Sequence, residues 1–420
     1  MKEDEVISAV ILENQAKNVQ NETGKKFHNM WAFVLYVIFN SSFYGYLMCR
    51  RFTHQPLSIN SYELIGKIAG SSVLFVLSTF LSLMYIPNVI NSVFWIYGGV
   101  DIGFFICATT KYEIFCCLLS LCYYLYFLFK FKNIEEETRM VLREACYILW
   151  RGFGSCMLIV SGMSSLLVAM AVVFMNIKVY CILDRIVVYS VFSMSLYFYI
   201  FFCIYTLKVY TYNYVMLTCS NKKKKINSSA LNTFYSLGSI TLSVYYHFWR
   251  VDCHLLEYLA NYLISFISSI QELVISTKTS YSMYLIGIHN SNLSDSLVKS
   301  KMFNLSRNSQ NIKEQINVFL VLLGFSFMLL VNYLYAQFFG SSFTHPYPYS
   351  DILRSIGRDP YTNNIVTFVI LSCSVCFLFS MFMVLISSSA LSLLILFIEH
   401  PDVLRKSNRQ VHGMLSVSNS

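Results

Sequence analysis

Long apolar runs, separated by short polar or basic segments, make up most of the chain. All six prolines lie outside these runs or at their borders, as expected when uninterrupted helices fill a bilayer. The pattern predicts an all-α, polytopic membrane protein. Nine runs are candidates for membrane helices: residues 30–49, 64–86, 89–109, 114–131, 155–176, 186–208, 255–275, 316–339 and 365–398.

The last of these runs, residues 365–398, contains neither a charged residue nor a proline. A single helix through it would be about 50 Å long, whereas the hydrocarbon core of a bilayer is about 30 Å thick. Either this helix tilts steeply, or its first part is buried in protein below the membrane. The triplet Ser387-Ser388-Ser389 marks the expected boundary between these two parts. We therefore predict a subunit-joining part over 365–386 and a crossing part from Ser387 to Glu399.

Two basic segments predict which side of the membrane the loops occupy. Four consecutive lysines, Lys222 to Lys225, and the basic loop 130–151 should both stay in the cytoplasm. Two apolar runs separate these segments, so their sidedness agrees. A cytoplasmic N-terminus then requires an even number of crossings before Lys130. Runs 64–86 and 114–131 are the most span-like, which leaves 30–49 as an interfacial or re-entrant helix and 89–109 as loop structure.

The amphipathic run 255–275 decides between two arrangements. If it crosses, the protein has seven spans, and the C-terminal tail 399–420 lies outside. The loop 277–315, with glycosylation sequons at Asn292 and Asn304, then also lies outside. If it does not cross and both doubtful N-terminal runs do, there are eight spans and the basic tail is inside.

We take the seven-span arrangement as the working prediction and keep the eight-span arrangement as the alternative. The predicted parts are a cytoplasmic N-terminal segment with an interfacial helix, a helical bundle, a final long helix and a C-terminal tail. They cover residues 1–63, 64–339, 365–398 and 399–420, and the bundle spans are 64–86, 114–131, 155–176, 186–208, 255–275 and 316–339.

Composition excludes a soluble globule, because 56% of the residues are hydrophobic and only 13% are charged. The net charge of +9 sits in loops beside spans, where cytoplasmic retention explains it, so we expect no nucleic-acid partner. Most of the 13 cysteines lie in apolar runs, where a thiol acts as a small hydrophobe. Cys373 and Cys376 have the spacing of half a zinc site but no second pair, so no metal is predicted.

No catalytic motif is apparent in the sequence. It contains no phosphate-binding G-x-x-x-x-G-K-S/T loop, no G-x-S-x-G elbow and no H-E-x-x-H helix, and its eight histidines are scattered. We therefore expect neither an enzyme nor a cofactor.

One face of the final helix is the strongest candidate functional feature. Ser388, Ser392, Leu396 and Glu399 recur at three- or four-residue steps and therefore share a face. Around a symmetry axis this face would supply hydroxyls, an apolar constriction and an acidic ring suited to cations. The alternative is that the serines pack against neighbouring helices and Glu399 sits at the membrane interface.

The C-terminal order resembles the insect chemoreceptor superfamily, in particular gustatory receptors and gustatory-receptor-like proteins. Their final helix ends with T-Y, five apolar residues and Q-F. In this chain Ser392-Leu393, five apolar residues and Glu399-His400 keep that spacing with a different residue at each named position. Residues 201–213 followed by 231–249 are similar to the aromatic end of the fourth helix and the cytoplasmic linker helix of those receptors.

The resemblance implies a subunit of a ligand-gated cation channel in the plasma membrane. In that family four identical or different subunits assemble, the final helix lines a central pore, and a small molecule binds in the outer half of each bundle. The sequence does not identify the ligand. Two other classes remain open: a non-conducting seven- or eight-span serpentine receptor or scaffold, and a small-solute transporter.

Overall fold

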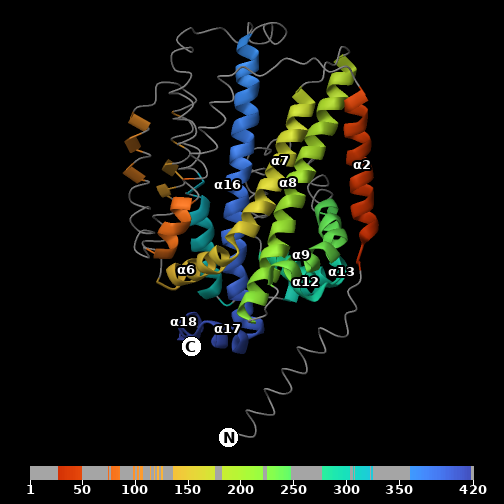
Figure 1. Cartoon of the computed structure of the whole chain (residues 1–420). Coiled ribbons are helices and arrows are strands. Elements are labelled where there is room, and N and C mark those ends of the chain that lie inside the picture. The colour runs from red at the N-terminus through yellow and green to blue at the C-terminus, as the bar shows by residue number, and fades with distance from the viewer. Residues whose placement is uncertain are drawn as a thin grey trace, which may run out of the picture. The chain divides into compact units, whose positions relative to one another are not determined.

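The computed structural model describes just over half of the chain, and every regular element in the described part is a helix (Figure 1). The all-α prediction is therefore confirmed for these residues. The described residues are 27–49, 74, 77–85, 98–99, 102–103, 105–106, 114, 118, 121–122, 124–125, 136–175, 182–220, 225–246, 277–302, 306, 308–321, 323–324 and 360–417. The named helices are α2 (Met30–Cys49), α6 (Glu136–Arg151), α7 (Phe153–Met175), α8 (Ile182–Cys219), α9 (Lys225–Tyr235), α12 (Thr277–His289), α13 (Leu293–Met302), α16 (Pro360–Glu399), α17 (Pro401–Ser407) and α18 (Arg409–Val417).

Two described helical segments, Ser190–Cys219 and Phe377–Glu399, are long and apolar enough to cross a membrane. A third is added if Glu136–Arg151 and Phe153–Leu167, which meet at an angle of 82°, form one broken span. The structure thus shows a helical protein with two or three candidate spans and does not show seven. The predicted spans 64–86, 114–131, 255–275 and 316–339 lie wholly or partly outside the described residues.

The chain divides into two compact units, which are described separately. Unit 1 consists of Met1–Ser41 and Tyr197–Asn304. Unit 2 consists of Ser42–Leu196 and Leu305–Ser420. The spans predicted at 155–176 and 365–398 correspond to α7 and α16 of unit 2, and the span predicted at 186–208 corresponds to the first two-thirds of α8.

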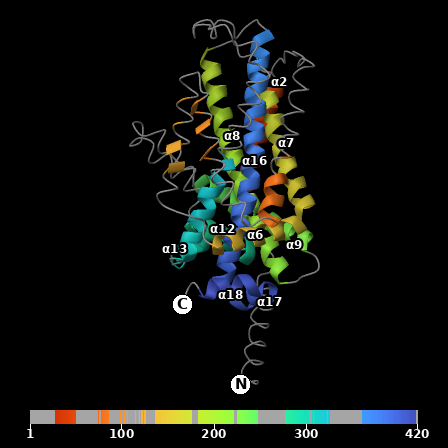
Figure 2. The ribbon, with the colours of Figure 1, turned by 90° about the vertical axis from the view of Figure 1, so that its left-hand side faces the viewer.

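Helix α16 is the central element of unit 2. It is continuous over 40 residues, which makes it about 60 Å long, and it does not break at the serine triplet (Figure 2). Both α6 and α7 pack against it. An aromatic cluster fixes part of this contact: the ring centroid of Phe382 lies 6.4 Å from that of Phe80 and 6.5 Å from that of Phe153.

Helix α6 forms because its apolar residues follow a helical period within a charged segment. Its buried side includes Leu142, Ala145 and Leu149, and this side packs on α16. Two polar contacts accompany the packing. The Thr138 hydroxyl donates to the side-chain oxygen of Gln315 at 2.7 Å, and the Ser389 hydroxyl donates to the Ala145 carbonyl at 3.3 Å. After a turn at Gly152 the chain changes direction into α7.

The C-terminal tail folds into two short helices beside the end of α16 (Figures 1 and 2). Pro401 occupies the first turn of α17, where its missing N–H is not needed. Helix α18 buries Val411 and Leu415 and packs against α6, and the rings of Phe397 and His412 lie 5.5 Å apart. The end of α16, the tail and α6 therefore belong to one end of unit 2.

Unit 1 packs α12 against the second half of α8. The ring centroids of Tyr212 and Tyr284 are 5.8 Å apart, and a Cβ added to Gly287 would lie 3.1 Å from the Val209 side chain. Lys208, at the predicted end of this span, is only 3% exposed, and α8 continues for 11 residues beyond it, to Cys219. The helix is thus longer than the predicted span, because its polar continuation is covered by protein.

The segment that enters α2 packs against α9 and the helical residues 237–246. Phe27 contacts Tyr235 at a centroid distance of 4.7 Å and Phe234 at 5.7 Å. Gly238 lies against the backbone of His28 and Asn29 so closely that no side chain fits between them. Residues 27–29 are therefore anchored on the helices that follow the four lysines.

Candidate functional site

The predicted pore face of α16 is buried inside unit 2. Ser388, Ser392 and Leu396 are 2%, 1% and 1% exposed. Glu399 is half-buried at the end of the helix, where α17 begins. The structure thus keeps the four residues on one helix, but it places the first three in contact with the chain's own side chains. Their pore-lining role stays a prediction.

The residues of the degenerate receptor motif also differ in burial along the helix. Leu393 is buried beside Ser392, whereas Glu399 and His400 are half-buried at the junction with α17. The backbone carbonyl of His400 accepts hydrogen bonds from Val403 and Leu404 at 3.1 and 3.3 Å, so this residue starts the next helix. The spacing therefore marks a helix end in this chain.

The ends of α16 and α6 come together although they were predicted on opposite sides of the membrane. The seven-span arrangement puts the loop 130–151 inside and the tail 399–420 outside. The structure packs α18 of the tail against α6 of that loop. This contact does not fit the seven-span arrangement, and it fits the alternative with an inside tail.

Unit 1 contains a second contact of this kind. The seven-span arrangement places residues 277–315 outside, yet α12 packs against α9, which begins at the last of the four lysines, Lys225. The hydroxyl of Ser236 also donates to the Ile286 carbonyl at 3.1 Å. The side chain of Asn292, in a predicted outside sequon, accepts a hydrogen bond from the Asn29 amide at 2.5 Å.

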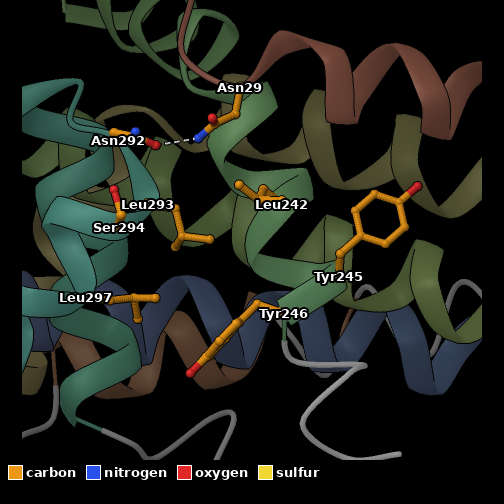
Figure 3. A pocket seen from close by; sticks show the side chains of 8 residues that line it. All are labelled: Asn29, Leu242, Tyr245, Tyr246, Asn292, Leu293, Ser294 and Leu297. Carbon is orange, nitrogen blue, oxygen red and sulfur yellow. Dashed lines mark hydrogen bonds between the residues drawn. The ribbon is translucent and has the colours of Figure 1, made fainter.

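The described part of unit 1 has a cavity of about 630 Å³ beside this hydrogen bond (Figure 3). Figure 3 shows Asn29 and Asn292 at one end of the cavity and the rings of Tyr245 and Tyr246 toward the other end. Burial raises the pKa of the Tyr245 hydroxyl. The full lining is Asn29, Leu242, Tyr245, Tyr246, Asn292, Leu293, Ser294 and Leu297.

The described lining of this open pocket carries no charged side chain and therefore offers no carboxylate, lysine or histidine for acid–base chemistry. Leucine and tyrosine side chains would favour an apolar or aromatic group, and the two asparagines could orient a polar one. Sequence reasoning missed the site because Asn29 and Asn292 lie 263 positions apart. The sequon at Asn292 was the only signal, and it suggested glycosylation instead.

Among the described residues, no group of three or more His, Cys, Asp or Glu side chains is arranged to hold a metal ion. A comparison of the chain with models of known protein families and with curated proteins finds no match. The resemblance to insect chemoreceptors therefore stays a prediction, which rests on the spacing at residues 392–400 and on the segments 201–213 and 231–249.

Proposed function

We propose that the protein is a non-conducting serpentine receptor or scaffold of the plasma membrane, in which the last long helix is a packed core helix. The observation that carries this proposal is the burial of Ser388, Ser392 and Leu396 against the protein's own chain. A face that lines a pore between four subunits would be open on each separate subunit. Small hydroxyl residues also suit close helix packing, which makes a pore unnecessary to explain them.

The two contacts between segments predicted on opposite sides support an even number of spans with both termini in the cytoplasm. In unit 2 the tail lies with α6, which is part of the basic loop 130–151, and in unit 1 helices α12 and α13 lie with the helices that follow the four lysines. Both flanks of residues 247–276 are then cytoplasmic. This sidedness agrees with the distribution of Lys and Arg, including Arg405, Lys406 and Arg409 of the tail.

A chemosensory cation channel is the second candidate, because Ser392-Leu393 and Glu399-His400 keep the receptor spacing and the serines share one face. It requires the buried face of α16 to leave its contacts with the rest of unit 2 and meet water at a symmetry axis. The channel also requires the final helix to end outside, whereas the packing of α18 on α6 favours an end inside.

Cysteine accessibility separates the two candidates. We would introduce Ser388→Cys, Ser392→Cys or Leu396→Cys and compare labelling by a membrane-impermeant thiol reagent with that of the parent. Ser416→Cys, at an exposed position of α18, is the matched control and should react once cells are permeabilised. The three core cysteines should react about 100-fold more slowly, since exposing them needs a local opening on the order of 3 kcal/mol.

The channel predicts a different labelling pattern. All three introduced cysteines would react at rates near that of Ser416→Cys, from the outside of intact cells, and modification would change a cation current. That result would overturn the proposed non-conducting function.

A further inference from the structure

One face of α6 is left open by its packing on α16. It carries Arg143, Tyr147, Trp150 and Arg151, which follow one another at helical spacing and are all exposed. Tyr147 and Trp150 are 45% and 37% exposed, whereas the opposite face of the helix is buried. Large aromatic side chains flanked by arginines are typical of a membrane–water interface.

The direction of α6 fits that location. It meets the apolar helix α7 at 82°, so if α7 crosses the bilayer at an ordinary tilt, α6 lies close to the membrane plane. The Arg151 guanidinium stacks over the Tyr147 ring at 4.5 Å and donates to the Tyr147 hydroxyl at 3.1 Å. This pairing holds a positive charge beside the exposed aromatic side chains.

The C-terminal helices, at the same end of unit 2, carry further exposed basic side chains. Arg405 and Lys406 of α17 and Arg409 of α18 are exposed, and α18 packs on α6. The exposed acids of these three helices are Glu136, at the far end of α6, and Asp402. Five exposed basic side chains thus stand against two exposed acidic ones. We call the five basic residues, with Tyr147 and Trp150, the basic end surface.

We infer that the basic end surface binds the headgroups of anionic phospholipids in the cytoplasmic leaflet. Its aromatic side chains are placed at the headgroup level, and its arginines and lysine complement negative phosphate and carboxylate groups. The cytoplasmic location rests on the proposed sidedness. The lipid chemistry rests only on the exposed residues of unit 2.

Fluorescence quenching in vesicles tests this inference on the full-length protein. A variant with Trp31→Phe, Trp95→Phe and Trp249→Phe keeps Trp150 as its one tryptophan. It is reconstituted in four parts phosphatidylcholine to one part phosphatidylserine, with bromine either on the phosphatidylserine or on an equal amount of the phosphatidylcholine. We expect the quenching to report a local ratio of phosphatidylserine to phosphatidylcholine at Trp150 that is about fivefold higher than in the bulk lipid, and we expect high salt to lower this ratio.

Charge-neutralising variants of the single-tryptophan protein show which basic side chains bind the anionic lipid. Arg143→Gln with Arg151→Gln should lower the enrichment, and adding Arg405→Gln, Lys406→Gln and Arg409→Gln should abolish it. Lys299→Gln, at an exposed lysine of α13 in unit 1, is the matched control and should change nothing.

Equal quenching by the two brominated lipids in the single-tryptophan protein would overturn the inference, whatever the variants do. Both leaflets of these vesicles contain the same lipids, so the outcome does not depend on sidedness. Failure of the lipid surface is therefore distinguishable from failure of the proposed topology or function.

Discussion

The close approach of Gly238 to the N-terminal segment makes Gly238→Ala a sensitive test of the unit 1 packing. A Cβ at this position would lie 2.5 Å from the carbonyl oxygen of Asn29 and closer still to that of His28. Real Cβ atoms essentially never come within 3.0 Å of another heavy atom, and both obstacles are backbone atoms that cannot rotate away. The N-terminal segment must therefore move by about 1 Å or detach.

The contacts that this movement disturbs set the size of the effect. The pairs of Phe27 with Phe234 and with Tyr235 are worth about 0.5–1.5 kcal/mol each. The hydrogen bond from Asn29 to Asn292 adds about 1 kcal/mol. Replacing a helical glycine by alanine itself stabilises the helix by up to about 1 kcal/mol, which offsets part of this loss. If all of these contacts are lost, the net loss in the free energy of unfolding is about 1–3 kcal/mol.

Thermal unfolding of the purified protein in detergent measures this loss, which for a chain of 420 residues corresponds to a fall in Tm of about 1–3 °C. Two matched glycine variants calibrate it. Gly154→Ala in α7 has no heavy atom within 4 Å of the new Cβ and should leave the Tm unchanged or raise it. Gly287→Ala, 3.1 Å from the Val209 side chain, should lie between the two. If Gly238→Ala is as stable as Gly154→Ala, the docking of the N-terminal segment is wrong.

Two further predictions test unit 2. Thr138→Val and Gln315→Leu should show a coupling energy of about 0.5–1.5 kcal/mol in a double-mutant cycle of unfolding, because their side chains share a buried hydrogen bond of 2.7 Å, and additive effects would contradict that contact. An epitope added after Ser420 should bind antibody only in permeabilised cells, because α18 packs against α6, which belongs to the basic loop 130–151 predicted in the cytoplasm. Binding on intact cells would refute the inside tail.

The long helices were the most predictable part of the fold. The runs 155–176 and 365–398 match α7 and α16 within a few residues, because continuous apolar sequence has few alternatives to a helix. Helix α8 continues for 11 residues beyond the predicted span, from Lys208 to Cys219. Hydropathy reports which residues lipid can cover. It does not reveal that Thr211 and Asn213, further along α8, are buried by protein.

Helix α6 was not predicted from the sequence. Residues 130–151 were read for their charges alone, as a cytoplasmic loop, although Val141, Leu142, Ala145 and Leu149 follow a helical period within them. The partners of this helix could not be predicted at all. Thr138 and Gln315 are 177 positions apart, and no local pattern links two positions at that distance.

The final helix α16 shows why spacing alone cannot separate a pore from a core. Residues that share a helix face recur at three- or four-residue steps whether that face meets water or another helix, and small hydroxyl residues suit both settings. The two settings differ in burial on the single chain. Along α16 this face is buried at Ser388, Ser392 and Leu396, and it becomes partly exposed only at Glu399, beside the start of α17. A pore requires the opposite pattern: the face must be exposed along the crossing part of the helix and buried only where subunits contact one another. The serine face of α16 is therefore better explained by the contacts of its own chain.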